Sequence, residues 1–239
     1  MIWAFLLLKK FEYQQPTHRV LAELNGNGLS LAKGMVTDGL QKLLPLFIPI
    51  YDAIVEYSIA AKHWHADETG WKVYETVGGK KNHRWFLWIF YNAETGAIST
   101  MKGAIEQELE INELLPSAKK LLVSLNKHRS GLIVFVAHSE IPMDNNTAER
   151  GLHGSVVGRK NYYGSGAVWS AELAAGLFTL FGTLKLWKLN IHTWLLGYFY
   201  ECAVLGGVPP ENIQKYLPWN MTEKQKQLFS EPPKHEESS

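Results

Sequence analysis

The feature that most constrains the fold is an almost unbroken apolar and aromatic run, WFLWIFY, at Trp85–Tyr91. A run of this length and composition, bounded by turn residues, is typical of a central strand buried on both faces of a sheet. Residues 71–76 before it alternate between apolar and polar side chains, and residues 97–101 after it make a third short segment. Glycine-containing turns separate the three segments. The sequence therefore predicts an antiparallel three-stranded meander.

Helical periodicity surrounds this meander. Apolar residues recur at spacings of three and four from Leu31 to Ala61, where Pro45 and Pro49 predict a kink or a break into two helices. Residues 1–25 show no clear period, so we expect an irregular opening. The other expected elements are a helical segment at 104–128 interrupted near Pro116, a short β-branched segment at 132–136, a helix that starts at Asp144, and buried helices at 171–189 and 191–205.

Composition limits the function classes without naming one. With 46% hydrophobic and 20% charged residues among 239, the chain is neither a disordered nor a fibrous protein. The net charge of +1 means that any binding to DNA or to a membrane has to come from a local patch. Cys202 is the only cysteine, which excludes an intramolecular disulfide and a cysteine-rich zinc site. The longest uncharged stretches have 12 residues, too few to span a bilayer, so we expect a cytoplasmic protein without a membrane partner.

Two motifs contain residues suited to metal-assisted chemistry. The first is His65-Ala-Asp-Glu-Thr-Gly-Trp71, where Asp67 beside a rigid sheet could bind a metal; the alternative is an ordinary turn aspartate. The second runs from Ile141 to Gly164 and places Glu149 on a helix, followed by Arg150, Arg159 and Lys160. A carboxylate beside a basic, glycine-rich loop suits phosphoryl chemistry on a polyanion. Its alternative is a helix capped by Asp144 with a solvated basic loop.

Taken together, these motifs resemble the insertion-sequence sixty-six family of bacterial transposases. The residues that carry the resemblance are HADETGW, the WFLWIF strand, and IPMDNNTAERGLHGSVVGRKNYYGSG, within a region from about Gly28 to Phe229. The resemblance implies a DDE-type transposase with an α/β, RNase H-like fold and C-terminal helices. It further implies Asp67 and Glu149 as catalytic, metal-binding carboxylates, Mg²⁺ or Mn²⁺ as the cofactor, and DNA contacts through Arg150, Arg159 and Lys160.

The chain departs from the family pattern at the middle carboxylate. The resemblance places an aspartate of a Thr-Asp-Gly-Tyr-like motif between the first strands and the DNN block, but no aspartate occurs between Asp67 and Asp144. Thr37-Asp38-Gly39 precedes Asp67 and is in the wrong order. We therefore expect an internal deletion; Glu75 or Glu94 would have to substitute from unrelated strand or turn positions. The resemblance also implies a zinc-binding and helix-turn-helix region before the catalytic domain, and we expect this chain to lack it.

These observations lead to a domain hypothesis: an irregular N-terminal remnant at 1–27, an incomplete catalytic core at 28–166, a helical region at 167–230 and a disordered tail at 231–239. Three functions compete. The first is a transposase with impaired catalysis that acts on transposon ends in the nucleoid. The second is a non-catalytic remnant that binds DNA or other transposase subunits. The third, the least favoured, is a small-molecule hydrolase that uses Asp67 and Glu149 as an acid/base pair.

Some remaining features are interpreted as structural. Trp85, Phe86, Trp88 and Phe90 could stack on bases, but aromatic residues in a strand run are more often part of a core. His63, His65 and His83 have no spacing typical of metal ligands.

Overall fold

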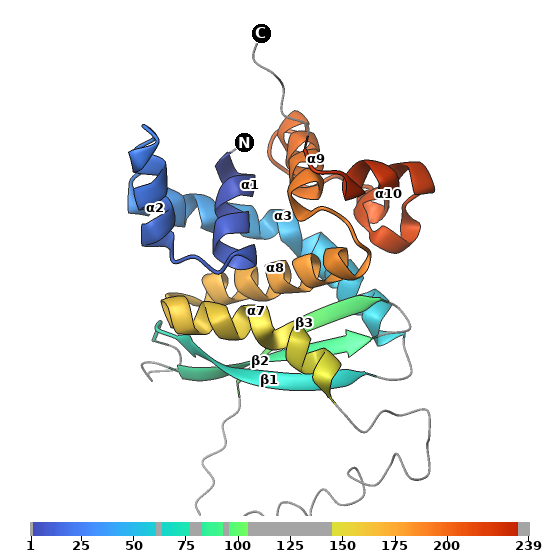
Figure 1. Ribbon diagram of the computed structural model, residues 1–239, viewed down its shortest axis with the longest axis horizontal. Coiled ribbons are helices and arrows are strands. Elements are labelled where there is room, and N and C mark those ends of the chain that lie inside the picture. Colours follow the sequence, from blue (N-terminus) through green and yellow to red (C-terminus); the bar gives the residue numbers. More distant parts are fainter. Residues whose placement is uncertain (1, 61–63, 77–82, 93–95, 105–144, 234–239) are drawn as a thin grey trace, which may run out of the picture.

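The computed structural model describes residues 2–60, 64–76, 83–92, 96–104 and 145–233, which form a mixed α/β structure (Figure 1). The strands are β1 (His65–Val73), β2 (His83–Asn92), β3 (Ala97–Ala104) and the two-residue β4 (Gly164–Ser165). The helices are α1 (Ile2–Leu7), the π-helical turn η1 (Leu8–Glu12), α2 (Thr17–Gly26), α3 (Lys33–Ile59), α7 (Asn146–Tyr162), α8 (Val168–Leu186), α9 (Ile191–Val204) and α10 (Glu223–Ser230), with short 3-10 turns η2 (Ile213–Tyr216) and η3 (Pro218–Asn220).

The sheet confirms the predicted meander. Its strand order is β3-β2-β1-β4, and both the β1/β2 and β2/β3 pairs are antiparallel. β4 pairs in parallel with the end of β1, where Lys72 lies opposite Gly164. Along β1 the expected alternation is present, because Trp71 and Val73 are buried while Lys72 is exposed.

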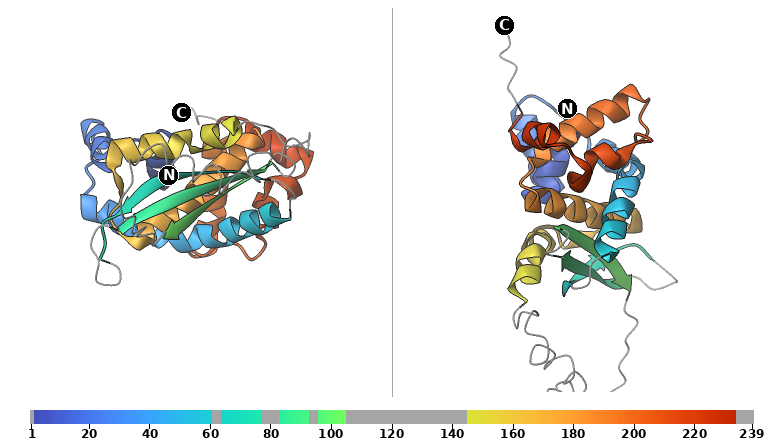
Figure 2. Two further views of the ribbon diagram at one scale, coloured as in Figure 1. Left: turned by 90° about the horizontal axis from the view of Figure 1, so that it is seen from below. Right: turned by 90° about the vertical axis from the view of Figure 1, so that its right-hand side faces the viewer.

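The expectation that β2 is buried on both faces is only half right. Leu87 and Ile89 are buried, whereas Phe86, Trp88 and Phe90 on the opposite face are half-buried. The reason is that the described helices all cover one face of the sheet (Figures 1 and 2). The aromatic side chains of the other face pack on one another instead, with the rings of Trp88 and Phe90 stacked 6.4 Å apart.

The helices form two layers above the sheet. Helices α7, α8 and α3 lie directly over the strands, and α1, α2, α9 and α10 lie beyond them (Figures 1 and 2). Helix α8 therefore runs between neighbours on several sides. Its sequence is apolar around the whole circumference, which is what a helix buried between two layers requires.

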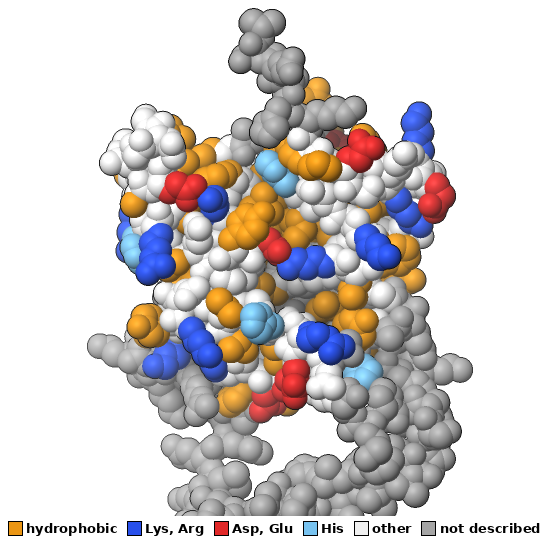
Figure 3. Space-filling view, viewed as in Figure 1, with side chains coloured by type: hydrophobic (Ala, Val, Ile, Leu, Met, Phe, Trp, Pro, Cys, Tyr) orange, Lys and Arg blue, Asp and Glu red, His pale blue; other side chains and the backbone are white. Residues whose placement is uncertain are grey.

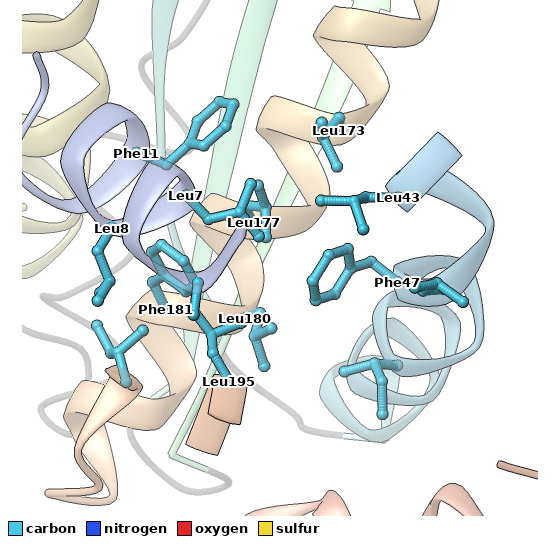
Figure 4. Close-up of a cluster of buried hydrophobic side chains, with 14 of the residues drawn as sticks. Leu7, Leu8, Phe11, Leu43, Phe47, Leu173, Leu177, Leu180, Phe181 and Leu195 are labelled. Atoms are coloured by element: carbon cyan, nitrogen blue, oxygen red, sulfur yellow. The ribbon is translucent and has the colours of Figure 1, made fainter. Parts of the chain in front are cut away.

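The expectation of an irregular opening at residues 1–27 is wrong. Residues 2–26 are largely helical, and Ala4 and Leu7 are 0% exposed. Leu7 and Phe11 pack against Leu177 and Phe181 of α8 within the main apolar cluster (Figure 4). Helices as short as α1 are marginal in isolation and depend on tertiary packing, which a search for long periodic segments overlooks.

Of the kink or break expected at the two prolines of α3, the break is absent, because the helix continues through Pro45 and Pro49. Each proline removes one backbone hydrogen bond from the helix. The two residues are four apart, on the same side of the helix, and Pro45 is exposed while Pro49 is half-buried. The carbonyl groups that lose a partner therefore face outward, where water can hydrogen-bond them. The opposite side of α3, including Leu43 and Phe47, is buried in the core.

One cluster of buried side chains extends from Ala4 to Phe229 and includes residues from all three expected regions, 1–27, 28–166 and 167–230. None of the described helices is long and apolar enough to cross a membrane. The segments expected at 104–128 and 132–136, and most of the tail after Glu231, lie outside the described residues.

Candidate functional site

Asp67 lies within β1, on the sheet face that the helices cover. It is directly opposite Ile89 of β2, and residues paired in this way point to the same side of the sheet. Ile89 packs with Ala148 and Leu152 in the first turns of α7. Asp67 is half-buried, and its Oδ1 accepts a hydrogen bond of 2.8 Å from the backbone N–H of Glu68. Asp67 therefore belongs to the same surface as the start of α7.

Two side chains attach α7 to β1. The amide Nδ2 of Asn145 donates to the carbonyl oxygen of Ala66 at 2.9 Å. Near the other end of the helix, Nη1 of Arg159 donates to the carbonyl oxygen of Gly70 at 3.1 Å. These bonds set the position of α7 along the strand. The start of α7 also corrects the predicted cap. The residue that precedes the helix is Asn145, and Asp144 lies outside the described residues.

Glu149 lies in the first turn of α7 and is exposed. Its backbone N–H donates to the carbonyl oxygen of Asn145 at 3.1 Å, and the side chain of Asn145 bonds to the residue next to Asp67. The structure thus brings the helical turn that carries Glu149 to the part of β1 that carries Asp67. A carboxylate in the first turn is also stabilised by the positive end of the helix dipole. That the two carboxylates lie within about 10 Å, near enough for one metal shell, stays a prediction.

A third carboxylate does not join this pair in the described part of the chain. There, no group of three or more His, Cys, Asp or Glu side chains is placed to hold a metal ion. Glu75 does not substitute for this third carboxylate, because its Oε2 accepts a 2.7 Å hydrogen bond from the backbone N–H of Val168 at the start of α8. Glu94, the other candidate, lies outside the described residues.

The three cations expected to contact DNA do not form one patch. Arg150 and Arg159 are nine residues apart, about two and a half helical turns, and so lie on opposite sides of α7. Arg150 faces a cavity between α7 and α8, whereas Arg159 is half-buried and turned toward Gly70 of β1. Lys160 is exposed at the end of the helix. No described contact tests the predicted DNA-binding roles, but the bond to Gly70 makes Arg159 the least available of the three for a phosphate.

The RKNYYGS segment, which contributes to the family resemblance, has several structural contacts. Nδ2 of Asn161 donates to the carbonyl oxygen of Gln14 at 2.8 Å, and the hydroxyl of Tyr162 donates to Oε1 of Gln14 at 3.2 Å. The indole N–H of Trp71 donates to the hydroxyl of Ser165 at 3.0 Å in the core. The segment therefore links α7 to β1 and to the N-terminal helices.

Burial changes two pKa values near this junction. Desolvation lowers the pKa of Lys10 from 10.5 to about 8. Its Nζ lies 4.2 Å from the centre of the Tyr162 ring. Burial raises the pKa of the Tyr162 hydroxyl above its usual value of 10.0. Both shifts favour the uncharged form, as expected for side chains enclosed between η1 and α7.

Several other sequence interpretations are tested by the structure. Cys202 is buried, at 2% exposed, as expected for a small apolar side chain. Trp85 packs against the apolar core as predicted. His65 lies near the ring of Tyr91, with centroids 6.1 Å apart. His63 lies outside the described residues.

Sequence reasoning missed the cavity that Arg150 faces. Its polar lining includes Glu12 of η1, His153 of α7 and Lys185 of α8, which are far apart in the sequence. No spacing rule connects η1 with α7 and α8, so only the packing of the N-terminal helices brings these residues together.

Comparison with known proteins identifies the family. The sequence model described as "Transposase IS66 family" matches residues 1–105 and 97–173, most of the chain. Two relatives from Sinorhizobium fredii (strain NBRC 101917 / NGR234) are similar. "Uncharacterized protein y4jD" is 32% identical over 93 residues, 39% of this chain and 18% of the relative. "Uncharacterized protein y4hP" is 28% identical over 93 residues, 39% of this chain and 16% of the relative.

The matched stretch thus spans less than one fifth of either relative's length. No solved structure matches the chain. The family match begins at residue 1 and includes the strands, α7 and the start of α8. On the strength of that match, this chain belongs to the IS66 family of transposases.

Proposed function

We propose that this chain is a DNA-binding member of its family, built on an incomplete RNase H-like, DDE-type core with impaired catalysis. The observation that carries the proposal is the hydrogen bond between Asn145 and Ala66, because it holds the first turn of α7 beside Asp67. Asp67 and Glu149 are then the first and last carboxylates of the site. DNA at transposon ends is the proposed substrate, in the cytoplasm and associated with the nucleoid, with other transposase subunits as possible partners.

Asp67 and Glu149 have the right chemical type of ligand for divalent cations, but two carboxylates are too few to hold a pair of ions. Carboxylate oxygens are the ligands that Mg²⁺ and Mn²⁺ prefer, and Mg²⁺ is commonly held by one or two of them together with waters. A bound ion would polarise a phosphoryl oxygen of the DNA backbone. The two carboxylates suffice for one weakly held ion. A two-metal arrangement needs ligands for both ions, and the described part of the chain provides no third group at this place.

An internal deletion near the end of β3 accounts for the shortage. The sequence contains no aspartate between Asp67 and Asp144. The family match is divided into two segments that overlap at residues 97–105, the stretch that contains β3. A discontinuity at this position is what a deletion of the middle-aspartate region would produce. We infer that the deletion removed the strand that carried the middle carboxylate.

The experiment is a nicking assay with purified chain, Mg²⁺ or Mn²⁺, and DNA that contains the terminal repeats of the element. We expect no nicks above background, since a loss of about 4 kcal/mol in transition-state stabilisation already slows a reaction about a thousandfold. Asp67→Ala serves as the matched control. Reproducible cleavage that Asp67→Ala abolishes would refute impaired catalysis and indicate another residue in place of the missing aspartate.

The alternative is a non-catalytic remnant whose main partner is an intact transposase rather than DNA. Glu75 favours this alternative, because it lies eight residues along the chain from Asp67, about 26 Å in extended backbone, and its carboxylate holds the start of α8. Retention of the chain by an intact family member on a column, with no retention by terminal-repeat DNA, would support it. Retention by DNA alone would favour the main proposal.

A further inference from the structure

A cavity of about 580 Å³ lies beside α7, on the side away from β1. Four parts of the chain line it: η1 with the turn after it, the end of β2 with the start of β3, one side of α7, and the C-terminal half of α8. Its volume is within the range of small-molecule sites in proteins, about 300–1,000 Å³. Figure 3 shows the face of the molecule that carries α7, with Lys and Arg side chains spread across it and Asp and Glu side chains scattered among them.

The inner wall of the cavity is apolar and aromatic. Phe11, Phe178 and Phe181 contribute to it, and the rings of Phe11 and Phe178 meet edge to face at 6.1 Å. Tyr13, in the turn after η1, also lines the cavity and is 62% exposed, so its ring is available to a ligand. Gly154 of α7 leaves its part of the wall without a side chain. These surfaces suit a flat ring better than a small ion.

The polar lining is mainly basic. Arg150 and His153 are both exposed and lie on the same side of α7, three residues apart. Lys185 reaches the cavity from α8, where its Nζ is 2.7 Å from Oε1 of Glu12. The Lys185 side chain is 56% exposed, and ion pairs in contact with water contribute little to stability. A phosphate group can therefore compete with Glu12 for Lys185.

The cavity also adjoins the candidate site. Arg150 directly follows Glu149 in α7, and Gly151, which also lines the cavity, lies against Ile89, the residue opposite Asp67. A DNA strand with a phosphate at Asp67 and Glu149 would bring a neighbouring nucleotide toward Arg150. Arginine binds phosphate through two parallel hydrogen bonds, and aromatic rings stack on bases of any sequence.

We propose that this cavity binds the terminal nucleotide of a DNA strand, with its phosphate at Arg150 and Lys185 and its base against the aromatic wall. The inference rests on the proposed function, because it takes DNA as the source of the nucleotide. It assigns Arg150 to a single nucleotide rather than to the backbone of a duplex, and it separates Arg150 from Arg159 and Lys160 in role.

The test measures binding of deoxyadenosine monophosphate, inorganic phosphate and deoxyadenosine to the full chain by ligand-observed NMR. We expect the monophosphate to bind more tightly than either of its parts. Arg150→Gln should weaken its binding about tenfold, the usual effect of losing a hydrogen bond to a charged group. Glu12→Gln should strengthen binding severalfold, since it releases Lys185. Lys42→Gln, an exposed change on α3, is the control and should have no effect.

Equal binding of the monophosphate and inorganic phosphate, or no effect of Arg150→Gln, would overturn the inference. The same variants are then tested with a single-stranded oligonucleotide. If the chain binds the oligonucleotide but not the monophosphate, the cavity inference fails and the proposed function stands. If the monophosphate binds and the oligonucleotide does not, DNA is excluded as the source, and the proposed function fails with it.

Discussion

Gly164 is a position at which a single added methyl group should be strongly destabilising. It follows Tyr163, which ends α7 in the left-handed conformation, and it starts β4 with φ at +130°. A Cβ atom at Gly164 would lie 2.2 Å from the carbonyl oxygen of Lys72 and 3.0 Å from its carbonyl carbon. Both contacts are with backbone atoms of β1, so no side chain can rotate away to make room.

The expected loss of stability has two sources. An alanine held in this region of φ costs about 1–3 kcal/mol. Relief of the clash requires β4 to move away from β1, which also strains the hydrogen bond from Trp71 to Ser165, worth about 1 kcal/mol. We therefore expect Gly164→Ala to lower the free energy of unfolding by about 3 kcal/mol. Whole domains are stable by only about 5–15 kcal/mol.

Urea unfolding followed by circular dichroism and tryptophan fluorescence measures this loss. Gly166→Ala is the matched control, because a Cβ atom there meets no heavy atom within 4 Å. Its free energy of unfolding should stay within about 0.5 kcal/mol of the parent. Equal unfolding midpoints for Gly164→Ala and Gly166→Ala would show that β4 does not need a glycine and would refute the reasoning.

Three further predictions follow from contacts described above. Lys160→Ala should reduce the salt dependence of DNA binding by about 0.9 in log–log slope, measured by fluorescence anisotropy, whereas Arg159→Gln should leave the slope unchanged and lower stability by about 1–2 kcal/mol. The pKa of Lys10 is lowered to about 8 in the folded chain, so above pH 8 the unfolded chain binds more protons and the free energy of unfolding should rise with pH toward 10. Lys10→Met should flatten this rise when the free energy is measured by urea unfolding at several pH values, and an unchanged pH dependence would assign the rise to other groups. Leu177→Ala, at a side chain that is 0% exposed, should cost about 2–5 kcal/mol, against less than about 0.5 for Leu228→Ala, which is 62% exposed; similar unfolding midpoints for the two would contradict the described core.

The meander could be predicted because its signals are local. The apolar run of β2 and the alternation around Trp71 each fall within one strand, and side-chain period alone assigns them. The N-terminal helices could not be predicted in this way. Leu7 and Phe11 are in the core because α8 lies against them, and no pattern within the first 27 residues contains that information.

The arrangement of the predicted basic patch could be predicted from the sequence only in part. Arg150, Arg159 and Lys160 are close in sequence, and a tally of charge treats them as one group. Helix geometry places Arg150 and Arg159 on opposite sides of the helix axis, and their spacing of nine residues alone predicts this. Which side of the helix faces the sheet is set by Ala148 and Leu152 packing on Ile89, and that requires the tertiary structure.

Several residues of the family motif make structural contacts that do not depend on catalysis. Asn145 and Arg159 donate to β1 carbonyl groups, and Asn161 donates to the backbone of Gln14, so these residues hold α7 in place whether or not a metal is bound. A chain that lost turnover would still need them to fold. Retention of the motif is therefore expected in active and inactive members alike and does not distinguish between them. In the proposed function the distinction lies in the carboxylates around Asp67, because they would hold the metal ions that stabilise the charge developing at the attacking and leaving oxygens.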